Sequence, residues 1–267
     1  MFTQYFGLKF NPFSKEMDEK DAFMSNDAKE LLARLEFMKK TRGFFLLTAE
    51  SGFGKTTLLR KFAASLNTGL FNVYYSALAS LTVMDFYRSL VLRMGETPAY
   101  QKIRMFEQLQ HLISASYHEK RVTPVFILDE AQSLSGGILE DLRMIFNFKM
   151  DSENPFITVI AGNPNIRRKL QLSANQALRQ RIIGNYHMIG LLRDEIKPYI
   201  TSRLALAGAA DINIFSDAAL ESMFTSTGGA LRLINTLAIA SLTCACSRNQ
   251  NIVNEEIVYQ ADRDIEI

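Results

Sequence analysis

The sequence predicts an α/β fold in which a five-stranded parallel sheet is flanked by helices and followed by a small all-helical domain. Up to about residue 191, short apolar runs alternate with helical patterns, as in chains that build a parallel sheet. A glycine-bearing loop directly after the first predicted strand fits the same architecture. From residue 192 onward only helical patterns follow. We therefore expect a core domain over 1–191 and a helical lid domain over 192–267.

The elements follow in chain order. An aromatic, proline-punctuated segment opens the chain, and we expect it to pack on the core domain because it is too apolar to stay free. Ser25, Asn26 and Asp27 are typical helix-capping residues and predict a helix that runs to about Lys40. The predicted strands cover 44–47, 70–75, 122–128, 156–161 and 182–188. The predicted helices cover 56–66, 82–94, 101–118 and 134–149 in the core, and 193–207, 216–227, 230–247 and 254–262 in the lid.

Composition limits the function classes. The chain has 267 residues, is 48% hydrophobic and carries a formal net charge of +2, so no global charge demands a nucleic-acid partner. No apolar run approaches the roughly 20 residues that span a bilayer, and no signal peptide opens the sequence. We therefore expect a cytoplasmic protein without a membrane partner. Cys244 and Cys246 lie two apart on a predicted helix, where they do not face each other, and the histidines show no metal-ligand spacing.

A glycine-bearing loop joins the first predicted strand to the next helix. Residues 48–57 read TAESGFGKTT. Such a loop cradles phosphates, because glycines let backbone N–H groups face a polyphosphate and the helix N-terminus adds positive charge. Ala49 replaces the usual first glycine, and we expect the loop to tolerate its small side chain. The residues expected to hold the nucleotide are Ser51, Gly52, Phe53, Gly54, Lys55, Thr56 and Thr57.

Two carboxylates complete the predicted nucleotide site. The apolar run 125–128 ends in Asp129 and Glu130, and a buried strand would deliver both acids to the sheet edge where ligands bind. We expect Asp129 and the Thr56 hydroxyl to hold Mg²⁺, and Lys55 to meet the outer phosphates. Glu130 would orient the attacking water. A pair of surface acids is the alternative for Asp129 and Glu130. The pattern predicts Mg²⁺-dependent ATP hydrolysis.

These motifs resemble those of AAA+ ATPases, a class of P-loop NTPases. More narrowly, they are similar to the branch that contains ExeA-type proteins and transposition regulators of the TnsC, TniB and MuB kind. The similarity covers nearly the whole chain. The segments that carry it are YFGL at 5–8, NPF at 11–13, DEAQ at 129–132, AGNPNIR at 161–167, LRQRI at 178–182 and GGALRLIN at 228–235.

The resemblance implies further contacts to a nucleotide within one subunit. Asn163 follows the fourth predicted strand and would bridge the γ-phosphate and the attacking water, although an Asn-Pro turn also fits the sequence. Arg232, near the start of a lid helix, would reach the same subunit's phosphates, with a surface arginine as the alternative. Phe10 or Phe13 in the opening segment is expected near the adenine base.

The resemblance also implies assembly. Arg181, just before the fifth predicted strand, would act as an arginine finger toward the neighbouring subunit's nucleotide, and Arg179 is the second candidate. A solvated pair at a helix end is the alternative. An arginine finger requires that subunits meet, so we expect nucleotide-dependent rings or helical filaments of this chain.

Transposition regulators of this branch assemble on duplex DNA and mark it for a transposase. The resemblance therefore implies duplex DNA and a transposase as partners. Lys102 and Arg104 open a predicted helix and are candidates for phosphate contacts, with a solvated helix face as the safer alternative.

Two other functions stay open. ExeA-type secretion ATPases carry a membrane span and a periplasmic part after the ATPase, which this sequence does not show. A slow ATP switch that loads or adapts a replication protein is the third hypothesis.

Overall fold

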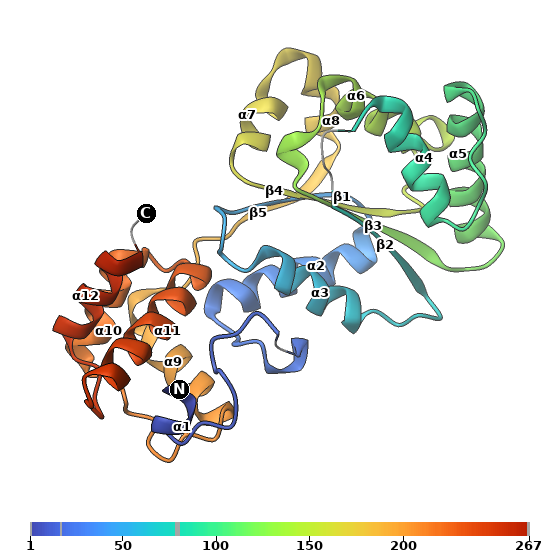
Figure 1. Ribbon diagram of the computed structural model, residues 1–267. Coiled ribbons are helices and arrows are strands. Elements are labelled where there is room, and N and C mark those ends of the chain that lie inside the picture. Colours follow the sequence, from blue (N-terminus) through green and yellow to red (C-terminus); the bar gives the residue numbers. More distant parts are fainter. Residues whose placement is uncertain (1, 17, 78–80, 266–267) are drawn as a thin grey trace. The chain divides into compact units, whose positions relative to one another are not determined.

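The computed structural model describes residues 2–16, 18–77 and 81–265 (Figure 1). The chain divides into two compact units. The sheet unit comprises Glu30–Glu50 and Lys55–Met188. The helical unit comprises Met1–Lys29, Ser51–Gly54 and Ile189–Ile267. Each unit has its own hydrophobic core.

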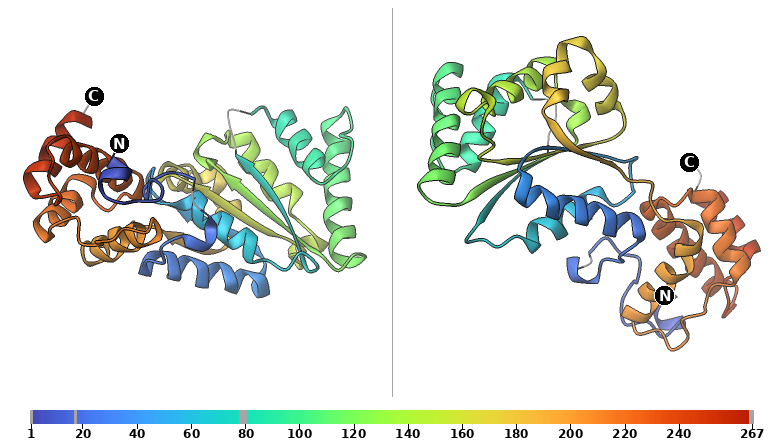
Figure 2. Two further views of the ribbon diagram at one scale, coloured as in Figure 1. Left: turned by 60° about the horizontal axis from the view of Figure 1, so that its bottom comes forward. Right: turned by 180° about the vertical axis from the view of Figure 1, so that it is seen from behind.

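The sheet unit contains the predicted five-stranded parallel sheet. Its strands are β1 Gly43–Thr48, β2 Phe71–Ala77, β3 Thr123–Asp129, β4 Ile157–Gly162 and β5 Ile182–His187. They pair in parallel in the order β2-β3-β4-β1-β5. The two views in Figure 2 show the twist of the sheet. Every residue of β1, β3 and β4 is buried, as the near-continuous apolar runs predict for central parallel strands.

The strand register aligns the predicted motifs at one edge of the sheet. Thr48 pairs with Gly162, and Ala77 pairs with Asp129. Because the strands are parallel, the loops that leave their carboxyl ends share this edge, which is where open α/β sheets bind ligands.

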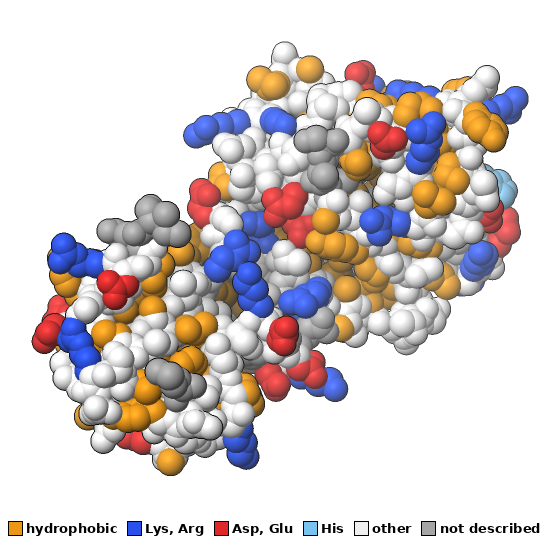
Figure 3. Space-filling model, viewed as in Figure 1, with side chains coloured by type: hydrophobic (Ala, Val, Ile, Leu, Met, Phe, Trp, Pro, Cys, Tyr) orange, Lys and Arg blue, Asp and Glu red, His pale blue; other side chains and the backbone are white. Residues whose placement is uncertain are grey.

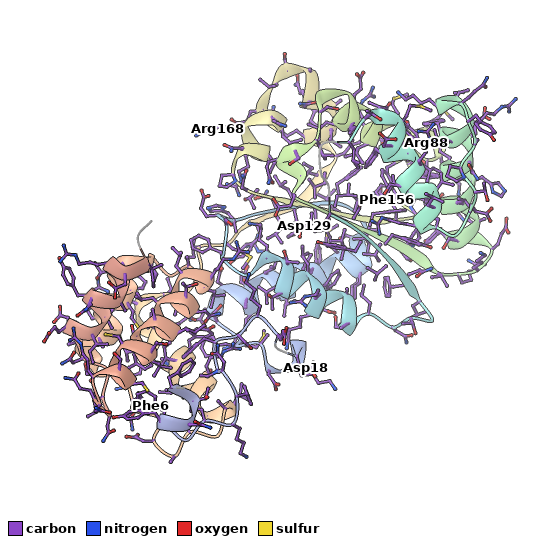
Figure 4. The ribbon with its side chains drawn as sticks, in the orientation of Figure 1. Phe6, Asp18, Arg88, Asp129, Phe156 and Arg168 are labelled. Atoms are coloured by element: carbon purple, nitrogen blue, oxygen red, sulfur yellow. The ribbon has the colours of Figure 1, made fainter. Side chains whose placement is uncertain are left out.

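Helices cover both faces of the sheet (Figure 1). On one face lie α2 Asn26–Thr41 and α3 Lys55–Ser65. On the other lie α4 Val83–Arg93, α5 Lys102–His118, α6 Gly136–Ile145, α7 Asn165–Gln171 and α8 Gln176–Gln180. Aromatic side chains pack between the sheet and these helices, and the rings of Phe44, Phe146 and Phe156 contact one another. Figure 4 labels Phe156.

Two helical details differ from the sequence prediction. Helix α6 ends at Ile145 rather than at 149, because Phe146, with φ of −94° and ψ of 26°, leaves the helical conformation and Phe148 pairs with Glu153 in an isolated bridge. The sequence does not predict α7 and α8, because each is too short to show a helical period.

The helical unit contains α1 Phe2–Tyr5, α9 Ile196–Leu206, α10 Asp217–Thr227, α11 Leu231–Ser247 and α12 Glu255–Ile265. Short 3₁₀ turns complete the described elements, at Glu19–Asp21 in this unit, at Ala131–Ser133, Lys149–Asp151 and Ser173–Asn175 in the sheet unit, and at Arg193–Glu195 before α9. Across the part of the chain that the structure describes, no helix is long and apolar enough to cross a membrane.

The opening segment packs differently from our expectation. Leu8 and Phe13 are buried in the core of the helical unit, together with Tyr199 of α9. The backbone N–H of Lys9 donates to the carbonyl of Ala207. The prediction that this segment packs on the core domain was therefore wrong: its apolar side chains complete the small core of the helical unit.

Candidate nucleotide site

The phosphate loop has the backbone geometry that its glycines predict. Gly52 and Gly54 both have a φ of 87°, a region in which residues with a Cβ are strained. At Gly52 an added Cβ would lie 3.0 Å from Cβ of Arg232. The loop leads directly into the first turn of α3, whose backbone N–H groups point toward it.

Ala49 fits the loop, as expected. It is fully buried, and its backbone does not adopt the left-handed conformation. Its N–H donates to the carbonyl of Gly162 over 3.1 Å, which ties the start of the loop to the end of β4. The position therefore needs a small residue rather than a glycine.

Lys55 lies buried beneath the loop. Its ammonium donates hydrogen bonds to the carbonyl oxygens of Ala49 at 2.8 Å and Glu50 at 3.0 Å. These bonds hold the positive charge at the loop, where the outer phosphates are expected. Of the other predicted loop residues, Ser51 is exposed, whereas Phe53 and Thr57 are half-buried.

The Asp129 carboxylate collects three donors. The Thr56 hydroxyl donates to Oδ2 over 2.9 Å, and the Tyr75 hydroxyl donates to the same oxygen over 3.2 Å. The N–H of Glu130 donates to Oδ1 over 2.9 Å. Figure 4 labels Asp129 at the sheet. A hydroxyl and a carboxylate oxygen side by side are hard oxygen donors of the kind that Mg²⁺ prefers, so these residues fit the expected ion.

Tyr75 was missed by sequence reasoning. Burial, followed by the neighbouring charge of Asp129, raises the pKa of Tyr75 to about 12, so the hydroxyl keeps its proton and remains a donor. In the sequence Tyr75 is one aromatic residue in an apolar strand. Only the pairing of β2 with β3 reveals its contact with Asp129.

Glu130 and Asn163 are joined by a third side chain, Gln132. The Gln132 amide donates to Oε2 of Glu130 over 2.5 Å, and its carbonyl oxygen accepts the backbone N–H of Asn163 over 3.1 Å. Glu130 itself is exposed and has a φ of 58°. The side-chain oxygen of Asn163 accepts the N–H of Asn165 over 3.0 Å, so the Asn-Pro turn is present at the position expected to sense the γ-phosphate.

Arg232 contacts the phosphate loop within the helical unit. Its backbone N–H donates to the carbonyl of Gly52 over 3.1 Å, and its guanidinium donates to the Ser51 hydroxyl over 3.3 Å. Its expected role toward the phosphates of the same subunit stays a prediction. The side chain starts from the first turn of α11.

The two candidates for the arginine finger, Arg181 and Arg179, differ in their hydrogen bonds and in their exposure to solvent. The Arg181 guanidinium donates to the carbonyl of Arg143 over 2.6 Å and forms a 2.9 Å ion pair with Asp151, and its side chain is 17% exposed. Arg179 is exposed and lines a surface pocket together with Arg167 of α7. Arg181 is thus held within its own subunit, whereas Arg179 faces solvent.

The two candidate DNA contacts both form ion pairs within the sheet unit. Lys102 lies 2.8 Å from the largely buried Asp141, and Arg104 lies 3.2 Å from Glu107. Over the region of α4 and α5, Figure 3 shows basic side chains interspersed with acidic and hydrophobic ones. Arg88, labelled on α4 in Figure 4, pairs with Asp85. The solvated helix face therefore explains these residues well.

The two phenylalanines expected near the adenine base, Phe10 and Phe13, also differ in the exposure of their side chains. Phe13 is 2% exposed and belongs to the core of the helical unit, which leaves it no free face for a base. Phe10 is 48% exposed. Only Phe10 stays a candidate.

Comparisons with known proteins agree with this geometry. A family model described as an AAA domain matches residues 38–170. General secretion pathway protein A of Aeromonas hydrophila is 33% identical over 98% of this chain, which spans only 48% of that protein's length.

Solved structures share the fold at low identity. Cdc6p from Pyrobaculum aerophilum has a TM-score of 0.70 at 16% identity, with 95% of this chain and 70% of that chain covered. The RuvB branch-migration motor of Thermotoga maritima has a TM-score of 0.61 at 20% identity, with coverages of 97% and 74%. The ORC1 protein of Aeropyrum pernix, solved in complex with DNA, has a TM-score of 0.65 at 16% identity, with coverages of 96% and 69%. These similarities concern the fold alone.

Proposed function

We propose that this protein is a Mg²⁺-dependent ATPase of the AAA type that acts as a switch, assembling with ATP and releasing on hydrolysis. The match of residues 38–170 to the AAA-domain model and the P-loop fold support this proposal. The observation that carries the proposal is the hydrogen bond of 2.9 Å between the Thr56 hydroxyl and the Asp129 carboxylate. It brings the end of the phosphate loop and the end of β3 together as one site.

In this proposal, each residue of the site has its own role. Loop N–H groups and the Lys55 ammonium would bind phosphate, and Thr56 and Asp129 would hold Mg²⁺, which would neutralise charge at the phosphates. Tyr75 orients the Asp129 carboxylate through its hydroxyl. Glu130 orients the attacking water and accepts its proton, with Asn163 beside it.

We propose that a neighbouring copy completes the site. Arg179 is the better candidate for the arginine finger, because its guanidinium is exposed while that of Arg181 is bound to Arg143 and Asp151. In this proposal Arg181 fixes the end of α8, so that Arg179 is presented to the next subunit. Arg232 reports the nucleotide to the helical unit through its contacts with Gly52 and Ser51.

The first candidate use of the switch is the regulation of transposition. The proposal is that ATP-bound rings or filaments form on duplex DNA in the cytoplasm and recruit a transposase. It is supported by the resemblance of the motifs to the TnsC, TniB and MuB kind. Lys102 and Arg104 would have to exchange Asp141 and Glu107 for phosphates, so other basic residues contribute more if DNA binds.

The second candidate use is secretion. The identity of 33% with general secretion pathway protein A extends over nearly the whole of this chain and supports it. In this proposal the ATPase drives or gates a secretion component rather than marking DNA.

One experiment separates the two uses. Fluorescence anisotropy with a labelled 40-base-pair duplex is measured with ATP, ADP and no nucleotide, at several salt concentrations. The transposition proposal expects ATP-dependent binding that weakens at least about a hundredfold between 50 and 200 mM salt, in keeping with several phosphate contacts. ATP hydrolysis without any salt-sensitive duplex binding favours secretion. Absence of hydrolysis under every condition contradicts the shared ATPase proposal.

A further inference from the structure

We propose that Gln132 is a positioning residue that locks the base Glu130 to the sensor Asn163, and that Lys169 extends this lock to helix α7. The inference rests on the proposed ATPase function and adds a regulatory connection to it. Gln132 lies in the 3₁₀ turn after β3, outside the residues that the motifs assign to the nucleotide.

The orientation of the Gln132 amide follows from its partners. The backbone N–H of Asn163 can only donate, so the oxygen of the amide must face it. The NH₂ group then points at the Glu130 carboxylate, which accepts its hydrogen bond. Since the two ends of one planar amide contact the base and the sensor segment, neither contact can shift without the other.

The space for Gln132 is built into β4. At Gly162 an added Cβ would lie 2.7 Å from the amide oxygen of Gln132 and 3.2 Å from its backbone nitrogen. The backbone of Gly162 does not have a positive φ, so close approach rather than conformation requires glycine there. The end of β4 therefore packs directly against Gln132.

Lys169 connects the lock to α7. Its ammonium donates to the carbonyl of Gln132 over 2.5 Å and to the carbonyl of Leu134 over 2.8 Å. The carbonyl of Lys169 in turn accepts a hydrogen bond of 2.8 Å from Asn175, in the turn before α8. The same helix α7 carries Arg167, which lines the surface pocket with Arg179.

This connection makes the position of Glu130 respond to a neighbouring subunit. A subunit that binds at Arg179 and Arg167 pushes on α7 and α8, and Lys169 transmits the movement to the turn that carries Gln132. The position of Glu130 then depends on assembly as well as on nucleotide. The coupled element is a turn held by named hydrogen bonds, which is the kind of physical link that coupling requires.

The test uses the full chain and compares wild type with single and double variants. Gln132→Leu removes both amide contacts, Gln132→Glu keeps the acceptor but removes the donor, and Lys169→Met keeps the stem but removes the charge. Gln250→Leu, at an exposed turn of the helical unit, is the matched control. The readouts are kcat at low and high protein concentration, the Kd of a fluorescent ATP analogue, and Tm.

We expect Gln132→Leu and Gln132→Glu to lower kcat about tenfold or more while the Kd of the analogue changes less than about twofold, since the lost bonds position the base and not the phosphates. Lys169→Met should remove the rise of kcat with protein concentration. The Gln132→Leu/Lys169→Met double variant should match Gln132→Leu alone, because both act through one link.

Distinct results overturn the inference. If wild-type protein hydrolyses ATP and Gln132→Leu is as active, Gln132 does not position the base. If the losses in the double variant multiply, Lys169 acts separately. If the Kd rises and the Tm falls along with the loss of kcat, the role is structural. Gly162→Ala, which displaces Gln132 without altering it, should lower kcat selectively if Gln132 positions the base, and should not do so if the role is structural. A wild type without hydrolysis defeats the proposed function instead.

Discussion

The hydroxyl of Thr56 donates a hydrogen bond of 2.9 Å to Oδ2 of Asp129. The two residues are far apart in the sequence, and the bond joins the first turn of α3 to the end of β3. Since Tyr75 donates to the same oxygen, the carboxylate has a fixed orientation. This pair is the structural basis for the proposed metal site.

Thr56→Val should raise the Mg²⁺ concentration needed for half-maximal hydrolysis about tenfold, because valine keeps the shape of threonine and removes one oxygen ligand. Hydrolysis is measured across a Mg²⁺ titration at saturating ATP. Thr68→Val, at an exposed position after α3, is the control and should leave the titration unchanged. An unchanged titration for Thr56→Val would remove the hydroxyl from the metal site.

Lys55→Met should weaken ATP binding roughly 10- to 100-fold, the loss expected for one or two charge-assisted hydrogen bonds. Methionine keeps the buried stem but leaves the carbonyls of Ala49 and Glu50 without their ammonium donor, so a small fall in Tm should accompany the loss. Calorimetric titration gives the affinity. The same substitution at Lys40, exposed at the end of α2, should have no effect on it.

Tyr75→Phe should destabilise the fold by about 1 kcal/mol near neutral pH, because the hydrogen bond to Asp129 is lost. The pKa of Tyr75 is raised to about 12, above the value near 10 of the unfolded chain. The contribution of Tyr75 to stability is therefore fully present below pH 10 and declines between about pH 10 and 12. Urea unfolding from pH 7 to pH 11 should show the difference between wild type and variant shrinking only above pH 10. Tyr100→Phe, at a 95% exposed site, should show no difference at any pH.

Arg179→Ala and Arg181→Ala should have opposite signatures. Without Arg181, the Arg143 carbonyl and Asp151 lose their partner, and we expect a loss of about 1–3 kcal/mol in unfolding free energy. Without Arg179, stability should stay constant while the assembly-dependent part of kcat disappears and ATP still binds. Thermal unfolding and turnover against protein concentration distinguish them. If the Arg181→Ala protein is stable and binds ATP but does not hydrolyse it, Arg181 rather than Arg179 is the arginine finger.

The sequence predicts the sheet well, and it predicts that Thr56 and Asp129 meet at one edge of the sheet, because both depend on local patterns. Apolar runs fix β1, β3 and β4, and the placement of Thr56 and Asp129 follows from a loop and a strand end in a parallel sheet. Tyr75 and Gln132 escape prediction because their contacts depend on strand register and on the left-handed turn at Glu130. Phe13 shows the same limit: its apolar character is evident, but which core it joins depends on tertiary packing.

The most direct test of the central claim is the Glu130→Gln variant, which keeps size and hydrogen-bonding capacity but cannot accept a proton. We predict unchanged ATP affinity, turnover reduced at least about a hundredfold, and a persistent ATP-bound assembly in size-exclusion chromatography. Turnover equal to that of the wild type would contradict the assignment of Glu130 as the base and, with it, the proposed hydrolytic site.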